Sequence, residues 1–155
     1  MRKQFCAVIA LCIILFNMNL YGQGGHVEEY SPTLILPIGH TNAINTVEFS
    51  PDDQYLVTSS YDKSCKVWSA KSGVELFTMY GHSATVNTAC YSNSGKYIAT
   101  SSNDGTARIW SGTTARQIHT LSSHKANVRS AKFSFDDQYL VTASFDSTAR
   151  VWSVA

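Results

Sequence analysis

Apolar and polar residues alternate in short runs along most of the chain, a period that predicts β-strands rather than helices. Clusters of Asp, Asn, Ser, Gly and Pro separate these runs, as is typical of tight turns. A first strand is predicted at Ile44–Phe49, Val86–Tyr91 and Val128–Phe133. A second strand is predicted to begin at Tyr55, Tyr97 and Tyr139. The same two strands therefore occur three times.

Two further strands complete each predicted unit. The hairpin from the second to the third strand is expected to turn at Asp62, Asp104 and Asp146, and Asp104-Gly105 predicts a type I′ turn. The third strand ends in a tryptophan, and a fourth strand is predicted at residues 74–79 and 115–121. Residues 34–36 resemble an extra fourth strand that precedes the first unit.

A histidine, a threonine, an aspartate and a tryptophan recur three times at a spacing of 42 residues, without insertion or deletion. The sets are His40/Thr58/Asp62/Trp68, His82/Thr100/Asp104/Trp110 and His124/Thr142/Asp146/Trp152. A fixed period in the low forties is typical of an array whose units bury their apolar faces against one another. Glycine-histidine near the start of a unit and tryptophan near its end resemble the WD40 family, the four-stranded blades of a β-propeller.

This resemblance predicts an all-β fold made of three four-stranded antiparallel WD40 repeats, at about residues 33–69, 73–111 and 115–153. It also implies that all twelve residues form structural hydrogen-bonded chains, from tryptophan through threonine and histidine to aspartate. A hydroxyl, an imidazole and a carboxylate are also the parts of a nucleophilic triad. An active site is needed once, however, whereas a packing motif is needed in every repeat. We therefore expect no enzyme, no catalytic residue, no metal site and no cofactor.

Charge is sparse and balanced, with 12 Lys and Arg against 11 Asp and Glu, and only 15% of the residues are charged. The clustered Lys and Arg of a nucleic-acid footprint are absent from the sequence, so no nucleic-acid partner is expected. The composition therefore favours binding to a protein or peptide.

The N-terminus has the pattern of a secretory signal peptide: a basic start at Arg2 and Lys3, then an uncharged apolar run over residues 5–16. This predicts a signal peptide at residues 1–22, a linker at 23–32 and the repeats at 33–155. The run is shorter than the roughly 20 residues of a membrane span, so no stable span is expected after cleavage. The predicted location is secreted or periplasmic.

Three repeats are too few for a closed propeller, which has roughly four to eight blades. The third unit also stops at its third strand, while residues 33–38 supply a fourth strand at the front. Two explanations stay open. Either two chains pair head to tail as a homodimer that closes a six-bladed ring, or the chain is a truncated piece of a longer propeller.

In the family, partners commonly bind the face made by the loops that join the fourth strand to the next first strand and the second strand to the third. The resemblance places nine residues there: Ala43, Asn45, Tyr61, Thr85, Asn87, Asn103, Asn127, Arg129 and Phe145. The leading prediction is a secreted non-enzymatic scaffold that binds a protein or peptide at this face. The alternatives are a truncated fragment of a larger WD40 propeller protein and, less favoured, a propeller-based hydrolase or lectin-like domain.

Overall fold

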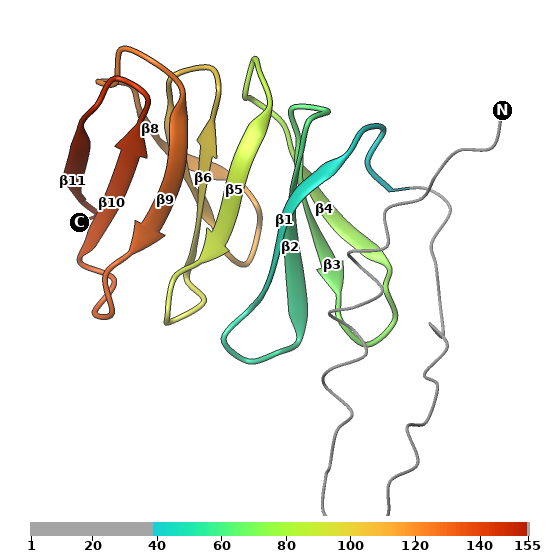
Figure 1. Cartoon of the computed structure of the whole chain (residues 1–155). Coiled ribbons are helices and arrows are strands. Elements are labelled where there is room, and N and C mark those ends of the chain that lie inside the picture. The colour runs from blue at the N-terminus through green and yellow to red at the C-terminus, as the bar shows by residue number, and fades with distance from the viewer. Residues whose placement is uncertain (1–38, 155) are drawn as a thin grey trace, which may run out of the picture.

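The computed structural model describes residues 39–154, and the described part folds into three antiparallel sheets that stand side by side (Figure 1). The first sheet contains β1 (Ile44–Phe49), β2 (Tyr55–Ser60), β3 (Cys65–Ser69) and β4 (Glu75–Met79). The second contains β5 (Val86–Tyr91), β6 (Tyr97–Ser102), β7 (Ala107–Ser111) and β8 (Gln117–Leu121). The third contains β9 (Val128–Phe133), β10 (Tyr139–Ser144) and β11 (Ala149–Ser153).

Each sheet is a simple meander in which every strand pairs with the next along the chain. Short polar turns join the strands, and alternating side chains give each sheet two faces. The first and second sheets enclose one core, which includes Val57, Val67, Val86 and Ile98. The second and third sheets enclose another, which includes Ala99, Ile109, Val128 and Leu140. The second sheet is therefore covered on both faces.

The all-β fold predicted from the sequence is confirmed, as three sheets that do not close into a ring. The first strands have the predicted bounds, and the second strands begin at the predicted tyrosines. The fourth strands begin slightly later than predicted, at Glu75 and Gln117. Gly73 and Ala115 just before them adopt positive φ angles of 67° and 55°, so the chain is still turning there.

The predicted type I′ turn at Asp104-Gly105 is wrong. A type I′ turn needs positive φ at both central residues, but only Gly105 has it, at 83°. The Gly105 N–H bonds the Ser102 carbonyl at 3.3 Å, and the Ser102 N–H bonds the Thr106 carbonyl at 3.0 Å. This is a three-residue hairpin loop, a type I turn followed by one left-handed residue. The φ angle of Asp104 is not positive, and its carboxylate accepts the Thr106 N–H at 2.9 Å, which caps the loop.

The predicted signal peptide (1–22), the linker (23–32) and the front strand at residues 34–36 lie outside the described residues. Within residues 39–154, no helix is long and apolar enough to cross a membrane.

Candidate functional site

Each recurring set of four residues is drawn together by one chain of hydrogen bonds. In the first sheet, His40 Nδ1 lies 2.8 Å from Asp62 Oδ2 and His40 Nε2 lies 2.7 Å from Thr58 Oγ1. Trp68 Nε1 donates to the same hydroxyl at 2.9 Å. Nδ1 carries the proton because the carboxylate can only accept, so Nε2 accepts from the threonine.

The second and third sheets repeat this geometry. The distances from histidine to aspartate are 2.8 Å in both, from histidine to threonine 2.8 Å, and from tryptophan to threonine 2.9 Å. The second set joins His82, Thr100, Asp104 and Trp110, and the third joins His124, Thr142, Asp146 and Trp152. The sequence spacing therefore places the same four side chains together in each sheet.

The pKa shifts of His40 and Asp62 favour the protonation states that the hydrogen-bonded network needs. Burial lowers the pKa of His40 below its usual 6.5, against the opposing effect of Asp62. Burial alone would raise the pKa of Asp62, but hydrogen bonds from Ser64 and His40 outweigh it, so the carboxyl pKa lies below its usual value. A neutral imidazole that donates to an ionised carboxylate is the state that these shifts favour.

The threonine hydroxyls are not placed for attack on a substrate. Thr58, Thr100 and Thr142 expose only 1%, 0% and 1% of their surface, and each hydroxyl already bonds an indole and an imidazole. A nucleophile must reach its substrate. The arrangement can stiffen a sheet, because it satisfies buried polar atoms that would otherwise be costly.

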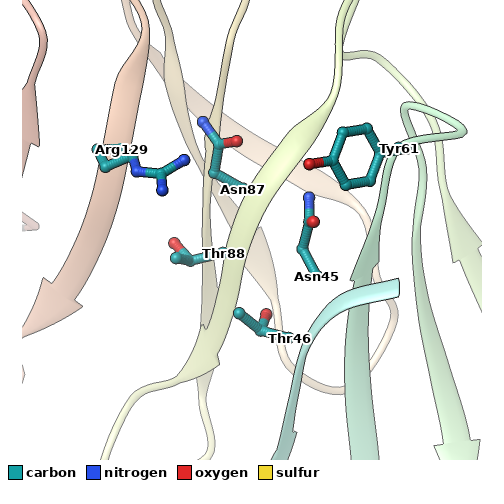
Figure 2. A pocket seen from close by; sticks show the side chains of 6 residues that line it. All are labelled: Asn45, Thr46, Tyr61, Asn87, Thr88 and Arg129. Atoms are coloured by element: carbon teal, nitrogen blue, oxygen red, sulfur yellow. The ribbon is translucent and has the colours of Figure 1, made fainter. Parts of the chain in front are cut away.

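A hollow of about 330 Å³ lies where the first strands of the three sheets converge (Figure 2). Its lining residues are Asn45, Thr46, Tyr61, Asn87, Thr88 and Arg129. Four of them were predicted as partner-binding residues, namely Asn45, Tyr61, Asn87 and Arg129. Figure 2 shows the Arg129 guanidinium beside Asn87 and the Tyr61 hydroxyl beside Asn45. We call this the axial hollow.

The five other predicted binding residues lie in the loops around the axial hollow. The carbonyls of Ala43, Thr85 and Asn127 accept backbone N–H groups from Tyr61, Asn103 and Phe145 at 2.9–3.0 Å. These bonds hold the two predicted loops of each sheet against each other. Arg129 Cζ lies 5.7 Å from the centre of the exposed Phe145 ring, in a cation–π contact.

Two of the predicted binding residues join neighbouring sheets. Asn45 Nδ2 donates to the Val86 carbonyl at 2.7 Å, which links the first sheet to the second. Asn87 Nδ2 makes the equivalent bond to the Val128 carbonyl at 2.8 Å, which links the second to the third. Sequence reasoning missed this structural role. The sequence did contain a sign of this role. The first and second units, each of which is followed by another unit, both have asparagine at this repeat position.

Thr46 also connects two sheets and was not predicted as a site residue. Its hydroxyl lies 2.7 Å from Ser59 Oγ and accepts the Ala89 N–H at 3.2 Å. An ion pair, Lys132 Nζ to Glu48 Oε2 at 2.5 Å, connects the third sheet to the first. Polar contacts thus fix the sheets relative to one another around the axial hollow.

Among residues 39–154, no three His, Cys, Asp or Glu side chains gather in a way that could hold a metal ion. The two cysteines of this part, Cys65 and Cys90, are free and buried.

Comparison with known proteins gives a consistent family assignment. The family model described as "WD domain, G-beta repeat" matches residues 31–69, 73–111 and 115–153. The solved structures titled "Structure of U3-55K" and "Crystal structure of RRP9 WD40 repeats" each superpose with a TM-score of 0.73 at 28% identity. Each match covers 76% of this chain, and 38% and 37% of those chains respectively. The three predicted WD40 repeats are thereby confirmed.

Curated relatives match over about one repeat each. Ribosome assembly protein 4 of Saccharomyces cerevisiae is 46% identical over 35 residues, which is 23% of this chain and 7% of that protein. The probable E3 ubiquitin ligase complex SCF subunit sconB of Aspergillus terreus is 43% identical over 42 residues, 27% and 6% respectively. The U3 small nucleolar RNA-associated protein 13 of S. cerevisiae is 44% identical over 34 residues, 22% and 4%. This chain thus spans a small part of the relatives it matches.

These relatives contradict the predicted secreted or periplasmic location. Two of them are named for ribosome assembly and for a small nucleolar RNA, which belong inside the cell. The prediction rested only on the charge and hydropathy pattern of residues 1–22, which lie outside the described part.

Proposed function

Because the chain belongs to the WD40 repeat family, we propose that it supplies three blades of a larger WD40 propeller and serves as a non-enzymatic scaffold for a protein or peptide partner. The relatives named for ribosome assembly and for an E3 ubiquitin ligase complex support a protein partner. The exposed third sheet supports a larger ring, since Val151 is 70% and Val141 44% exposed there. Further blades, or a second copy, would cover these side chains.

The axial hollow is the proposed partner site. The observation that carries this proposal is the break in the repeat at Arg129. At the equivalent positions, Asn45 and Asn87 are used to join sheets, whereas Arg129 brings a positive charge into the hollow. Tyr61 faces the hollow from the first sheet (Figure 2). Tyrosine and arginine are the residue types that most often carry binding energy in protein interfaces.

Photocrosslinking tests the site. In the full chain, p-benzoylphenylalanine would replace Tyr61 in one variant and Phe135 in a matched control. Phe135 is 92% exposed and lies in the turn before β10, away from the axial hollow. Crosslinking in cells of the source organism should give a discrete protein adduct from position 61 only. Arg129→Ala in the same chain should weaken that adduct. Identical adducts from both positions would refute the site.

Solution mass tests the larger ring. Light scattering on the chain should give a single-copy mass near the 17.0 kDa of the sequence, or aggregates, because three blades are too few to close a ring on their own. A mass of two copies would instead support a six-bladed ring made by a homodimer.

A further inference from the structure

A second hollow, of about 590 Å³, lies between the first and second sheets. On the side of the first sheet it is lined by Tyr55, Leu76 and Phe77, which remain 41%, 41% and 39% exposed. On the side of the second sheet it is lined by Gly95 and Gly112, among others. We call this the inter-sheet groove. None of the predicted partner-binding residues lies in it.

The groove contains a buried hydroxyl without a partner. Tyr91 is only 8% exposed, and its Oη makes no hydrogen bond. Burial raises the pKa of Tyr91, so the hydroxyl keeps its proton and remains a donor at neutral pH. A buried donor left unsatisfied costs about 1–3 kcal/mol, so such groups usually have an acceptor in the functional state.

The space between the second and third sheets provides an internal comparison, because the same positions are filled there. Phe133 takes the place of Tyr91, and its ring stacks on Tyr97 with centroids 6.3 Å apart and planes at 22°. Val154, buried in the second core, takes the place of Gly112. The equivalent place between the second and third sheets therefore has no tyrosine hydroxyl, and it has a valine side chain where the second sheet has glycine.

Gly112, in the wall of the inter-sheet groove, packs directly against the backbone of Gly95. A Cβ on Gly112 would lie 2.0 Å from the Gly95 carbonyl oxygen, so no side chain can be accommodated there without movement of the backbone. These two glycines therefore allow the turn before β6 and the segment after β7 to approach closely at the wall of the groove.

A negative charge stands at the edge of the inter-sheet groove. Asp52 lines it, and its pKa is lowered by hydrogen bonds from the Ser50 hydroxyl and the Gln54 N–H. The carboxylate is therefore ionised at neutral pH. A ligand with an apolar part and an adjacent positive charge would complement this edge.

We propose that the inter-sheet groove binds an extended peptide segment of a partner protein, with an aromatic or aliphatic side chain against Leu76 and Phe77. The Tyr91 oxygen is covered in the free chain, so a small shift of the groove side chains would let a peptide carbonyl accept its hydroxyl. A lysine or arginine of the peptide would lie beside Asp52. The axial hollow takes no part in this contact, so this inference stands apart from the proposed function.

The test uses two blocked pentapeptides and the full chain. The first probe is acetyl-Lys-Gly-Phe-Gly-Ser-amide, and the second replaces its lysine by glutamate. Chemical-shift titration should show the lysine probe binding with shifts at Leu76 and Phe77, and the glutamate probe binding at least about fivefold more weakly. Shifts confined to Tyr61 and Arg129, or no binding of the lysine probe at millimolar concentration, would overturn the proposal.

Two variants separate recognition from folding. Tyr91→Phe removes only the hydroxyl and gives the residue that the third sheet has at this position. It should weaken the lysine probe by about tenfold, the equivalent of one hydrogen bond. Its thermal unfolding temperature should stay at or above that of the wild type. Equal binding by Tyr91→Phe would mean that water satisfies the hydroxyl, and would overturn the proposal.

Asp52→Asn keeps the oxygen that accepts from Ser50 and Gln54 but removes the charge, so it should abolish the preference for the lysine probe. Asp136→Asn is the matched control, since Asp136 accepts the same two bonds from Ser134 and Gln138 in the third sheet. The control should bind both probes as the wild type does. Loss of the preference in both variants would mean that the effect is general charge attraction, against the proposal.

Discussion

The second and third sheets carry the same four-residue network but differ in how much apolar surface they bury. The histidine–aspartate, histidine–threonine and tryptophan–threonine distances agree between them. Yet Ile109 of the second sheet is 1% exposed, whereas Val151 at the same position of the third is 70% exposed. The network is therefore local to one repeat, while the apolar contribution depends on the neighbouring sheet. Two repeats with the same hydrogen-bond geometry can therefore contribute differently to stability.

The largest expected effect tests the apolar half of this comparison. Ile109→Ala should destabilise the chain by about 3 kcal/mol, because it opens a cavity between two sheets. Val151→Ala should change stability by less than about 0.5 kcal/mol, since the side chain is largely in solvent. Urea unfolding followed by tryptophan fluorescence measures both. Equal losses would show that the open face of the third sheet is covered in solution.

The next effect tests the polar half. His82→Ala and His124→Ala should each cost about 2 kcal/mol, because each removes the acceptor of a buried threonine hydroxyl and one of the donors to an aspartate. Both histidines are 8% exposed, so the two losses should be similar. Thermal unfolding of each variant beside wild type provides the check. An unchanged transition for either would mean that the network does not stabilise that sheet.

Acid should weaken both networks together. Burial would raise the pKa of Asp104, but hydrogen bonds from His82 and Thr106 outweigh it and keep that pKa below the usual 3.8. The pKa of Asp146 is also below 3.8, mainly because of the hydrogen bond from the Thr148 hydroxyl. A carboxyl group whose pKa is lower in the folded state than in the unfolded state stabilises the fold at pH values above its unfolded pKa. This stabilisation is lost as the pH falls through the folded pKa.

The lowered pKa of His40, mainly due to burial, acts in the same direction below pH 6.5. The unfolding free energy should thus fall slightly below pH 6.5 and steeply below about pH 4. Urea titrations between pH 7 and pH 2.5 measure it. Asp104→Asn and Asp146→Asn should each reduce the steep part of the slope. A reduction by only one of them would contradict the equivalence of the two networks.

The smallest effect concerns the hairpin loop. Gly105 of the second sheet and Ser147 of the third both adopt positive φ, at 83° and 65°. Serine is strained there, whereas glycine is not, although glycine loses more entropy on folding. Ser147→Gly should therefore stabilise the chain by about 0.5 kcal/mol, measured by urea unfolding. Destabilisation would show that this loop tolerates serine without strain.

Sequence by itself determined the family, the strands and the membership of each four-residue network. These depend on residues within one repeat, where alternation, turn residues and a fixed spacing of 42 positions leave little freedom. The sequence-based prediction of secretion failed because it used a single apolar run without any constraint from the fold.

Only the tertiary structure decided which surfaces face each other. Asn45 and Asn87 were predicted to bind a partner, and the structure adds a role that the sequence did not indicate, because their amides join neighbouring sheets. The Tyr91 hydroxyl is unpaired because the first sheet, which faces it across the groove, offers it no acceptor. Val151 is exposed because no sheet of the described residues covers that face of the third sheet. Burial and pairing are properties of two surfaces in contact, and the pattern of one strand determines only its own face.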